Sequence, residues 1–146
     1  MSIQNFNLRV YGLLLLEGKV LITHEHRAGI IMTKFPGGGL EKGEGILDAL
    51  KREFIEEMNL EIEVGEIFYV NDFLQISAFN SDDQLISFYY KIQTANPYMI
   101  SMDSEKAKLE KGQQIFEWVK FDDLCNYEFT FPIDKVVVEM LKVMKC

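Results

Sequence analysis

The stretch of sequence that decides the fold covers residues 34–60 and reads KFPGGGLEKGEGILDALKREFIEEMNL. Pro36 ends the apolar run before it, and the three glycines that follow permit positive φ, so an irregular loop is predicted there. Residues 46–58 then have helical periodicity and predict a helix with one apolar face. That face is formed by Leu47, Leu50, Phe54 and Met58. Asn59 follows the last turn, where asparagine is a suitable left-handed cap.

Acidic residues crowd one flank of this predicted helix. Glu53, Glu56 and Glu57 fall within little more than one turn, beside the apolar face rather than opposite it. Like charges at these spacings destabilise a helix, and Arg52 alone does not balance three carboxylates. For the helix taken alone, a solvated acidic surface is the simpler interpretation.

Two more glutamates, Glu41 and Glu44, precede the helix in the glycine-containing loop. So many carboxylates in a short stretch suit Mg²⁺, which prefers oxygen ligands and completes its shell with water and phosphate oxygens. A bound cation would relieve the repulsion and attract an anionic ligand. The formal net charge of the chain is −8, which would otherwise repel that ligand. The pattern therefore favours a metal site over a plain acidic surface.

The same stretch resembles the Nudix box, whose signature is G-x5-E-x7-R-E-U-x-E-E-x-G-U, with U a bulky apolar residue. Eight of the nine defined positions match in register: Gly38, Glu44, Arg52, Glu53, Phe54, Glu56, Glu57 and Leu60. At the remaining position Asn59 replaces a glycine, which a left-handed cap tolerates. Agreement at that many fixed spacings is far more specific than a lone glycine motif.

The resemblance implies a fold and an activity. The implied fold is an α/β/α sandwich with a mixed central sheet, a loop–helix–loop that carries the box, and a C-terminal helix, in one domain over residues 1–146. The implied activity is metal-dependent hydrolysis of a nucleoside diphosphate linked to another moiety X, by in-line attack of a water. Mg²⁺ is the implied cofactor, for which Mn²⁺ substitutes, and a small nucleoside diphosphate derivative is the implied partner.

The resemblance also assigns roles to residues of the box. The implied metal site consists of Gly38, Glu53, Glu56 and Glu57. One of the three glutamates, or an acid from another loop, would activate the water. Arg52 would orient a glutamate through a charge-assisted hydrogen bond, and Glu44 would be an outer ligand or would bind a water.

Four residues outside the box are candidate substrate contacts: His24, Arg27, Phe35 and Asp83. Arg27 is suited to bind a phosphate. For His24 a polar loop after a strand is the simpler interpretation, because the sequence offers no third metal ligand near it. Asp83 ends a predicted turn at residues 80–83, where aspartate is common in any case.

Outside the box, the chain has the pattern of a mixed α/β domain. Predicted strands cover residues 8–17, 20–25, 29–35, 62–79, 84–95 and 114–121, and a second helix covers residues 132–145. A turn at residues 18–19 is predicted to join the first two strands in a hairpin. Nudix proteins are often dimers, and the apolar strands leave room for a homodimer.

Composition narrows the class of protein. With 48% hydrophobic and 26% charged residues the chain does not look disordered, and its acidity argues against binding nucleic acid. No secretion leader or membrane-length apolar run is visible, so a cytoplasmic location without a membrane partner is expected. Cys125 and Cys146 make neither a disulfide framework nor a zinc site, and we expect one buried thiol and one loose C-terminal thiol.

Two alternatives stay open. The first is a Nudix-like sensor that binds a nucleotide derivative without cleaving it, which the complete set of glutamates disfavours. The second is other chemistry on the same fold, such as an isomerase, which would need a further reactive residue. The moiety X is open as well, because the segment after the box lacks the proline and tyrosine signatures of known substrate subgroups.

Overall fold

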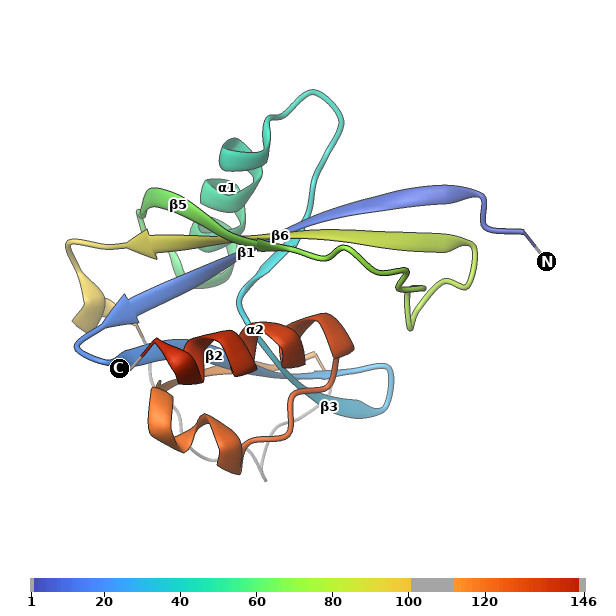
Figure 1. Ribbon diagram of the computed structural model, residues 1–146. Helices are drawn as coiled ribbons and strands as arrows, with labels where there is room; N and C mark the ends of the chain where they lie inside the picture. The colour runs from blue at the N-terminus through green and yellow to red at the C-terminus, as the bar shows by residue number, and fades with distance from the viewer. Residues whose placement is uncertain (1, 101–111, 145–146) are drawn as a thin grey trace.

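The computed structural model describes residues 2–100 and 112–144 (Figure 1). Its elements, in chain order, are β1 (Asn5–Leu16), β2 (Lys19–Arg27), β3 (Ile30–Lys34), β4 (Gly37–Gly39), α1 (Ile46–Met58), β5 (Glu63–Val70), β6 (Asp83–Gln93), the 3₁₀ helix η1 (Pro97–Met99), β7 (Gln114–Lys120), the 3₁₀ helix η3 (Phe121–Asn126) and α2 (Pro132–Val143).

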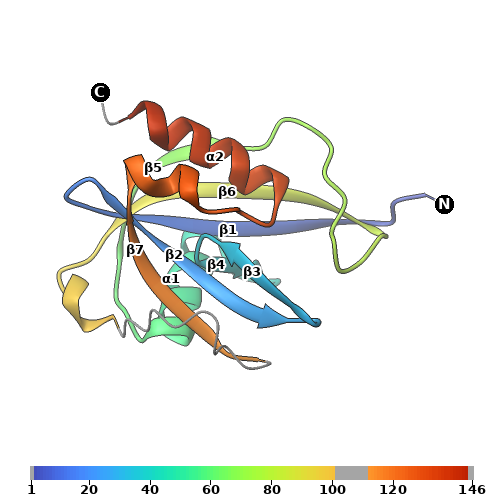
Figure 2. The same ribbon diagram turned by 90° about the horizontal axis from the view of Figure 1, so that it is seen from below.

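The strand β1 joins two groups of strands into one mixed sheet. Along most of its length β1 runs parallel to β6, from Asn5 opposite Asp83 to Leu14 opposite Ile92. On this side β5 pairs antiparallel with β6, and β4 pairs antiparallel with β1. The end of β1 turns to pair with β2, which lies antiparallel between β3 and β7. Figure 2 shows these latter strands crossing beside β1 and β6.

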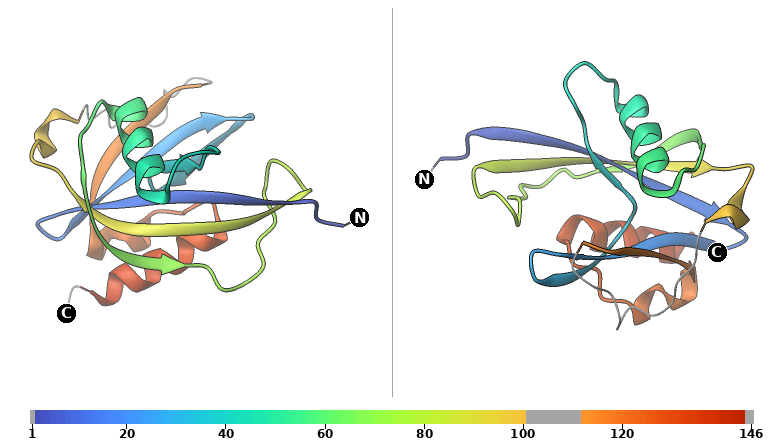
Figure 3. Two further views of the ribbon diagram at one scale, coloured as in Figure 1. Left: turned by 90° about the horizontal axis from the view of Figure 1, so that it is seen from above. Right: turned by 180° about the vertical axis from the view of Figure 1, so that it is seen from behind.

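One helix covers each side of the mixed sheet (Figures 1 and 3). α1 lies against one core, to which β1 contributes Leu14, and α2 lies against a second core, to which β1 contributes Leu13. Successive side chains of a strand point to opposite faces, so β1 supplies both cores. The expected α/β/α sandwich is confirmed. No helix within residues 2–100 and 112–144 is long and apolar enough to cross a membrane.

Two tight turns build the predicted hairpins. Glu17 and Gly18 have φ of 49° and 77°, and Ala28 and Gly29 have φ of 53° and 82°. Two successive residues with positive φ are typical of the type I′ turn, whose twist matches the twist of the strands that it joins. The turns bring β1, β2 and β3 into sequential contact, so the hairpin predicted near residues 18–19 is confirmed.

Two of the predicted elements are wrong in part. Gly37–Gly39, predicted as irregular loop, forms the short strand β4, because glycines let its backbone lie very close to β1. The strand predicted over residues 62–79 ends at Val70. There the Asn71 side chain replaces the backbone as a partner for β6: it accepts a hydrogen bond from the Ser87 N–H at 2.8 Å and donates one to the Leu85 carbonyl at 3.2 Å. Beyond this point the chain meets β6 again in the isolated bridge between Ile76 and Gln84.

The expectation of a buried thiol is also wrong. Cys125 is exposed in η3. Its neighbour Leu124 occupies the buried position of this short helix, so the next side chain points outward. Cys146 lies outside the described residues.

Candidate active site

The helix that carries the acidic residues begins and ends where the sequence predicts. At its start, the Gly45 N–H donates a hydrogen bond to the Asp48 carboxylate at 3.2 Å. At its end, Asn59 adopts the left-handed conformation, with φ of 52° and ψ of 42°. The Asn59 N–H donates to the Ile55 carbonyl at 2.9 Å, which closes the last turn. The replacement of glycine by Asn59 therefore leaves the helix end intact.

Arg52 gathers the glutamates of the box around one guanidinium group. It binds both oxygens of Glu44, with Nε at 3.0 Å and Nη2 at 2.7 Å. Its Nη1 donates to Glu53 at 3.0 Å and to Glu56 at 3.2 Å, and its Nη2 donates to the Gly39 carbonyl at 2.9 Å. Such a fork of charge-assisted bonds fixes the orientation of each partner. The hydrogen bond from Arg52 is the main reason that the pKa of Glu44 is lowered.

Gly38 makes room for the Glu53 carboxylate. A Cβ atom at Gly38 would lie 2.4 Å from Glu53 Oε1, closer than any real side chain allows. Gly37 meets the backbone instead: its φ is 153°, and a Cβ atom there would lie 2.1 Å from the Val10 carbonyl oxygen. The first glycine of this pair thus serves the fold, and the second serves the position of a carboxylate.

Glu57 is a shielded carboxyl group that the described residues satisfy only in part. Its Oε2 atom is shielded from solvent and has no hydrogen-bond partner among those residues. Burial raises the pKa of Glu57 to about 7, the nearby Lys34 ammonium acts against this shift, and the Glu53 and Glu25 carboxylates add to it. A shielded carboxylate oxygen near two further carboxylates is a group that a cation would stabilise.

These residues suit a hard divalent cation by their donor type. Within the described part of the chain, no three His, Cys, Asp or Glu side chains already converge closely enough to hold a metal ion. Glu56 is turned toward Arg52, with 58% of its side chain exposed, and Glu53 contacts the same arginine. The carboxylates are nevertheless oxygen donors of the kind Mg²⁺ takes, and the unpartnered Glu57 oxygen supports the fit.

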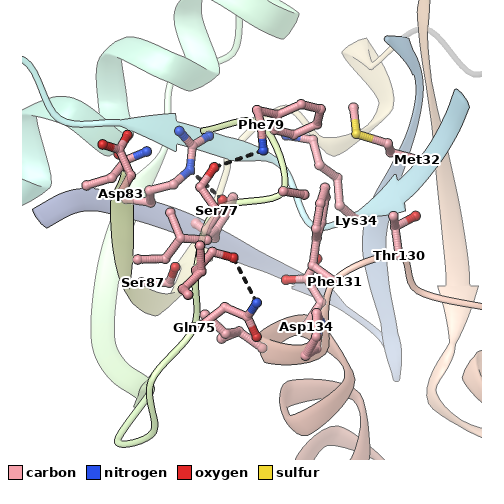
Figure 4. A pocket seen from close by; sticks show the side chains of 18 of the residues that line it. Met32, Lys34, Gln75, Ser77, Phe79, Asp83, Ser87, Thr130, Phe131 and Asp134 are labelled. Carbon is pink, nitrogen blue, oxygen red and sulfur yellow. Dashed lines mark hydrogen bonds between the residues drawn. The ribbon is translucent and has the colours of Figure 1, made fainter. Parts of the chain in front are cut away.

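A cleft of about 370 Å³ opens beside the start of α2, and no residue of α1 is among the described residues that line it. Strands β1, β3 and β6, the segment at residues 75–80 and the start of α2 all contribute to its lining. Figure 4 shows Phe79 and Phe131 among the side chains that surround it, together with Lys34 and Asp134. Lys34 connects the two regions, because it lines the cleft and its charge also opposes the upward shift of the Glu57 pKa.

Asp134 is a buried acid of the cleft that the sequence analysis missed. It accepts a hydrogen bond from the Tyr89 hydroxyl, and only 2% of the residue is exposed. Burial raises the pKa of Asp134 to about 7, although the bond from Tyr89 and the charge of Lys34 act in the opposite direction. The signal in the sequence was an acid in the first turn of an otherwise apolar helix, directly after Pro132 and Ile133.

The four candidate substrate contacts divide into two pairs. Arg27 and Asp83 line the cleft, and the Arg27 guanidinium lies 4.5 Å from the centre of the Phe79 ring. Phe35 is fully buried and stacks on Phe129, outside the cleft lining.

His24 is also buried, and it lies in β2 rather than in a polar loop. Its Nδ1 is 2.8 Å from Thr33 Oγ1, and its Nε2 is 2.8 Å from Glu117 Oε1. The same glutamate accepts a hydrogen bond from the Tyr127 hydroxyl through its other oxygen. His24 is thus part of a polar network inside the fold.

A model of the NUDIX domain matches residues 6–141. The chain belongs to the Nudix family. An 8-oxo-dGTP diphosphatase of Buchnera aphidicola subsp. Schizaphis graminum is 23% identical over 137 residues, which cover 92% of this chain and 93% of that protein. The expected enzyme class is confirmed: the chain is a Nudix hydrolase that acts on phosphorus-containing acid anhydrides.

Solved structures of Nudix proteins show the same fold. A Nudix hydrolase from Nitrosomonas europaea has a TM-score of 0.69 and 24% identity, with 91% of this chain and 86% of that chain covered. The MutT protein from Methanosarcina mazei has a TM-score of 0.71 and 16% identity, with 97% of this chain and 96% of that chain covered. Likeness at such low identity speaks for the fold alone.

Proposed function

We propose that this Nudix hydrolase is a metal-dependent pyrophosphohydrolase that cleaves the diphosphate of a nucleoside diphosphate linked to another moiety. The observation that carries the proposal is the charge imbalance on α1. Arg52 is shared among several glutamates, and Glu57 keeps a shielded oxygen with no hydrogen-bond partner among the described residues. Lys34, whose charge acts on Glu57, lines a ligand-sized cleft, so the clustered carboxylates and this cleft together support cation-assisted binding of a phosphate chain.

In this proposal the box residues share the work. Gly38, Glu53, Glu56 and Glu57 would hold the divalent cation, Mg²⁺ or Mn²⁺, which when bound polarises the phosphoryl oxygens and lowers the pKa of a water. Arg52 keeps Glu44 and the carboxylates of α1 in fixed orientations. No covalent intermediate with the protein is required, since in-line attack by water needs only positioning and charge stabilisation.

The substrate is a nucleotide derivative whose base would occupy the cleft. Phe79 and Phe131, whose ring centres are 6.2 Å apart, line the cleft and offer faces for stacking. The 8-oxo-dGTP diphosphatase among the relatives makes oxidised purine nucleoside triphosphates the first compounds to test. A cytoplasmic location and a homodimer stay predictions from the sequence.

The experiment that tests this function is phosphate and pyrophosphate release across a panel of nucleotides. The panel contains ordinary and 8-oxo-purine nucleoside triphosphates, dinucleoside polyphosphates, ADP-ribose and nucleotide sugars, each with Mg²⁺, with Mn²⁺ and with chelator. Turnover that needs a divalent cation and disappears in Glu57→Gln would support the proposal and name the substrate. No release of phosphate or pyrophosphate from any compound of the panel, together with a nucleotide that raises the melting temperature, would instead indicate a sensor.

A further inference from the structure

Lys34 is a buried cation whose ion pair within the described residues is long. It ends β3, its side chain is 9% exposed, and its Nζ lies 3.7 Å from Glu25 Oε2. That distance is too long for a good hydrogen bond. No other ion pair or hydrogen bond joins the ammonium to the residues that the structure describes. The Lys34 charge also acts on Glu57 and Asp134, but neither carboxylate lies within ion-pair distance of Nζ, so the buried ammonium can still bind an anionic ligand.

Arg9 lies close to the same point of the cleft. Its Nε donates to the Tyr11 hydroxyl at 2.7 Å. Its guanidinium carbon lies 5.7 Å from the centre of the Tyr11 ring, and Lys34 Nζ lies 5.9 Å from the same centre. Burial lowers the pKa of Arg9, but Tyr11 and Glu53 outweigh it, so the net shift is upward. Two cations therefore gather around one tyrosine on the wall of the cleft, and Arg9 lies opposite Gly39 of β4 in the β1–β4 pairing.

The other charged residues of the cleft are already engaged. Asp134 accepts a hydrogen bond from the Tyr89 hydroxyl, and Asp83 accepts one from the Asn5 side-chain amide at 3.1 Å. Arg27 lies over Phe79. Lys34 and Arg9 are the cleft cations whose charges act on Glu57 and Glu53. This arrangement places positive charge on the path from the cleft to the box.

We propose that Lys34 and Arg9 bind the phosphate chain of the substrate where it passes from the cleft to the carboxylates of α1. The inference rests on the proposed function in taking the cleft and α1 as one site. It adds a ligand class, an oligophosphate chain long enough to meet both cations. Arg9 presents a planar fork that suits two phosphate oxygens, and Lys34 presents a compact point charge.

The test measures binding of inorganic tripolyphosphate by calorimetry, at fixed Mg²⁺ and again with chelator. The variants are Lys34→Met and Arg9→Met, with Lys142→Met as the matched control. Lys142 is a lysine of α2 that pairs with Glu139 on the surface, so its replacement removes the same charge at a distance. We expect each cleft variant to raise the Kd by roughly 10- to 100-fold, the range of a lost hydrogen bond to a charged group. The control should stay within about two-fold, and Lys34→Arg, which keeps the positive charge, should lose less affinity than Lys34→Met.

Several outcomes would overturn the inference. Failure of the wild-type protein to bind tripolyphosphate is one, and an unchanged Kd in both cleft variants is another. Circular dichroism checks that each variant is folded, and Arg9→Met carries the test if Lys34→Met does not fold. Nucleotide turnover with unchanged Kd values would leave the proposed function standing and reject the role of the two cations. Tripolyphosphate binding that depends on both cations, without turnover of any nucleotide, would support the role of the two cations and reject the proposed function.

Discussion

Glu57 and Glu117 are both partly buried carboxylates, and they differ in how their oxygens are satisfied. Glu117 uses both oxygens, one near His24 Nε2 at 2.8 Å and one as acceptor for the Tyr127 hydroxyl. Glu57 has a shielded oxygen without a hydrogen-bond partner among the described residues, and like charges lie nearby. Buried polar groups in folded proteins are usually hydrogen-bonded, so an exception requires an explanation.

This difference in hydrogen bonding suggests a structural role for Glu117 and a ligand-binding role for Glu57. The network around Glu117 ties β7 to β2 through His24, and His24 in turn to β3 through Thr33. A satisfied network of this kind rigidifies a fold and needs no ligand. The Glu57 oxygen without a described partner gains no such stabilisation, which is expected of a group that binds a cation. Four predictions test this contrast between Glu57 and Glu117.

The largest effect is expected from Glu57→Gln. Losing the charge should lower turnover by at least about 100-fold, more than the loss of an outer metal-site partner. The melting temperature without metal should stay the same or rise, because a poorly satisfied buried charge is removed. Turnover assays and thermal unfolding in chelator check both halves. Wild-type turnover in this variant would remove Glu57 from the metal site.

The adjacent glycines offer a second test. Gly37→Ala places a Cβ against backbone, at a φ of 153°, and should destabilise the fold by about 3 kcal/mol or more. Gly38→Ala meets only the end of the flexible Glu53 side chain, so it should unfold near the wild-type temperature and lose turnover by roughly 10- to 100-fold. Denaturant unfolding and turnover of both variants measure the contrast. Equal stability losses at the two glycines would contradict it.

Glu117→Gln should show the opposite profile to Glu57→Gln. The change weakens the bonds to His24 and Tyr127 in a half-buried network, at a cost of about 1–3 kcal/mol in the free energy of unfolding. Turnover per folded molecule should be unchanged. Glu139→Gln, at an exposed carboxylate of α2, is the control for removal of a glutamate charge. A large loss of turnover in Glu117→Gln at full folding would make Glu117 part of the reaction.

The smallest effect concerns pH. The pKa of Asp134 is raised from 3.8 to about 7 in the folded protein, and that of Glu57 from 4.5 to about 7. An acid whose pKa is raised in the folded state stabilises the fold at pH values below its pKa in the unfolded state. That contribution is lost as the pH rises through its pKa in the folded state. The free energy of unfolding without metal should therefore fall between about pH 4 and pH 7. Asp134→Asn should make this slope shallower, as denaturant unfolding at several pH values would measure, and an unchanged slope would exclude Asp134 as its source.

Sequence patterns predicted those elements of the fold that depend on residues close together in the sequence. The helix at residues 46–58 and its cap at Asn59 follow from periodicity and cap chemistry, and both are confirmed. The end of β5 could not be predicted in the same way. The Asn71 side chain ends the strand through hydrogen bonds to Leu85 and Ser87. The residues near Asn71 in the sequence do not indicate partners so far along the chain.

The candidate site was predictable to a similar extent. The box glutamates and Arg52 are close in sequence, so their proximity follows from one helix and the loop before it. Lys34 and Asp134 meet at the cleft only because β3 and α2 are brought together by the sheet. For His24 the sequence could not reveal that Glu117, far along the chain, would supply its partner.

The parallel pairing of β1 with β6 has a consequence for the order of folding. The pair joins Asn5 to Asp83, which are 78 positions apart, and closing so long a loop loses chain entropy before any contact compensates. The helix α1, by contrast, is built from hydrogen bonds between residues near in sequence. In refolding, amides of α1 should therefore gain protection from hydrogen exchange before those of β1, and the cleft should assemble last. Pulse labelling would decide the order of protection. Simultaneous protection of α1 and β1 would mean that the acidic helix forms only together with the sheet.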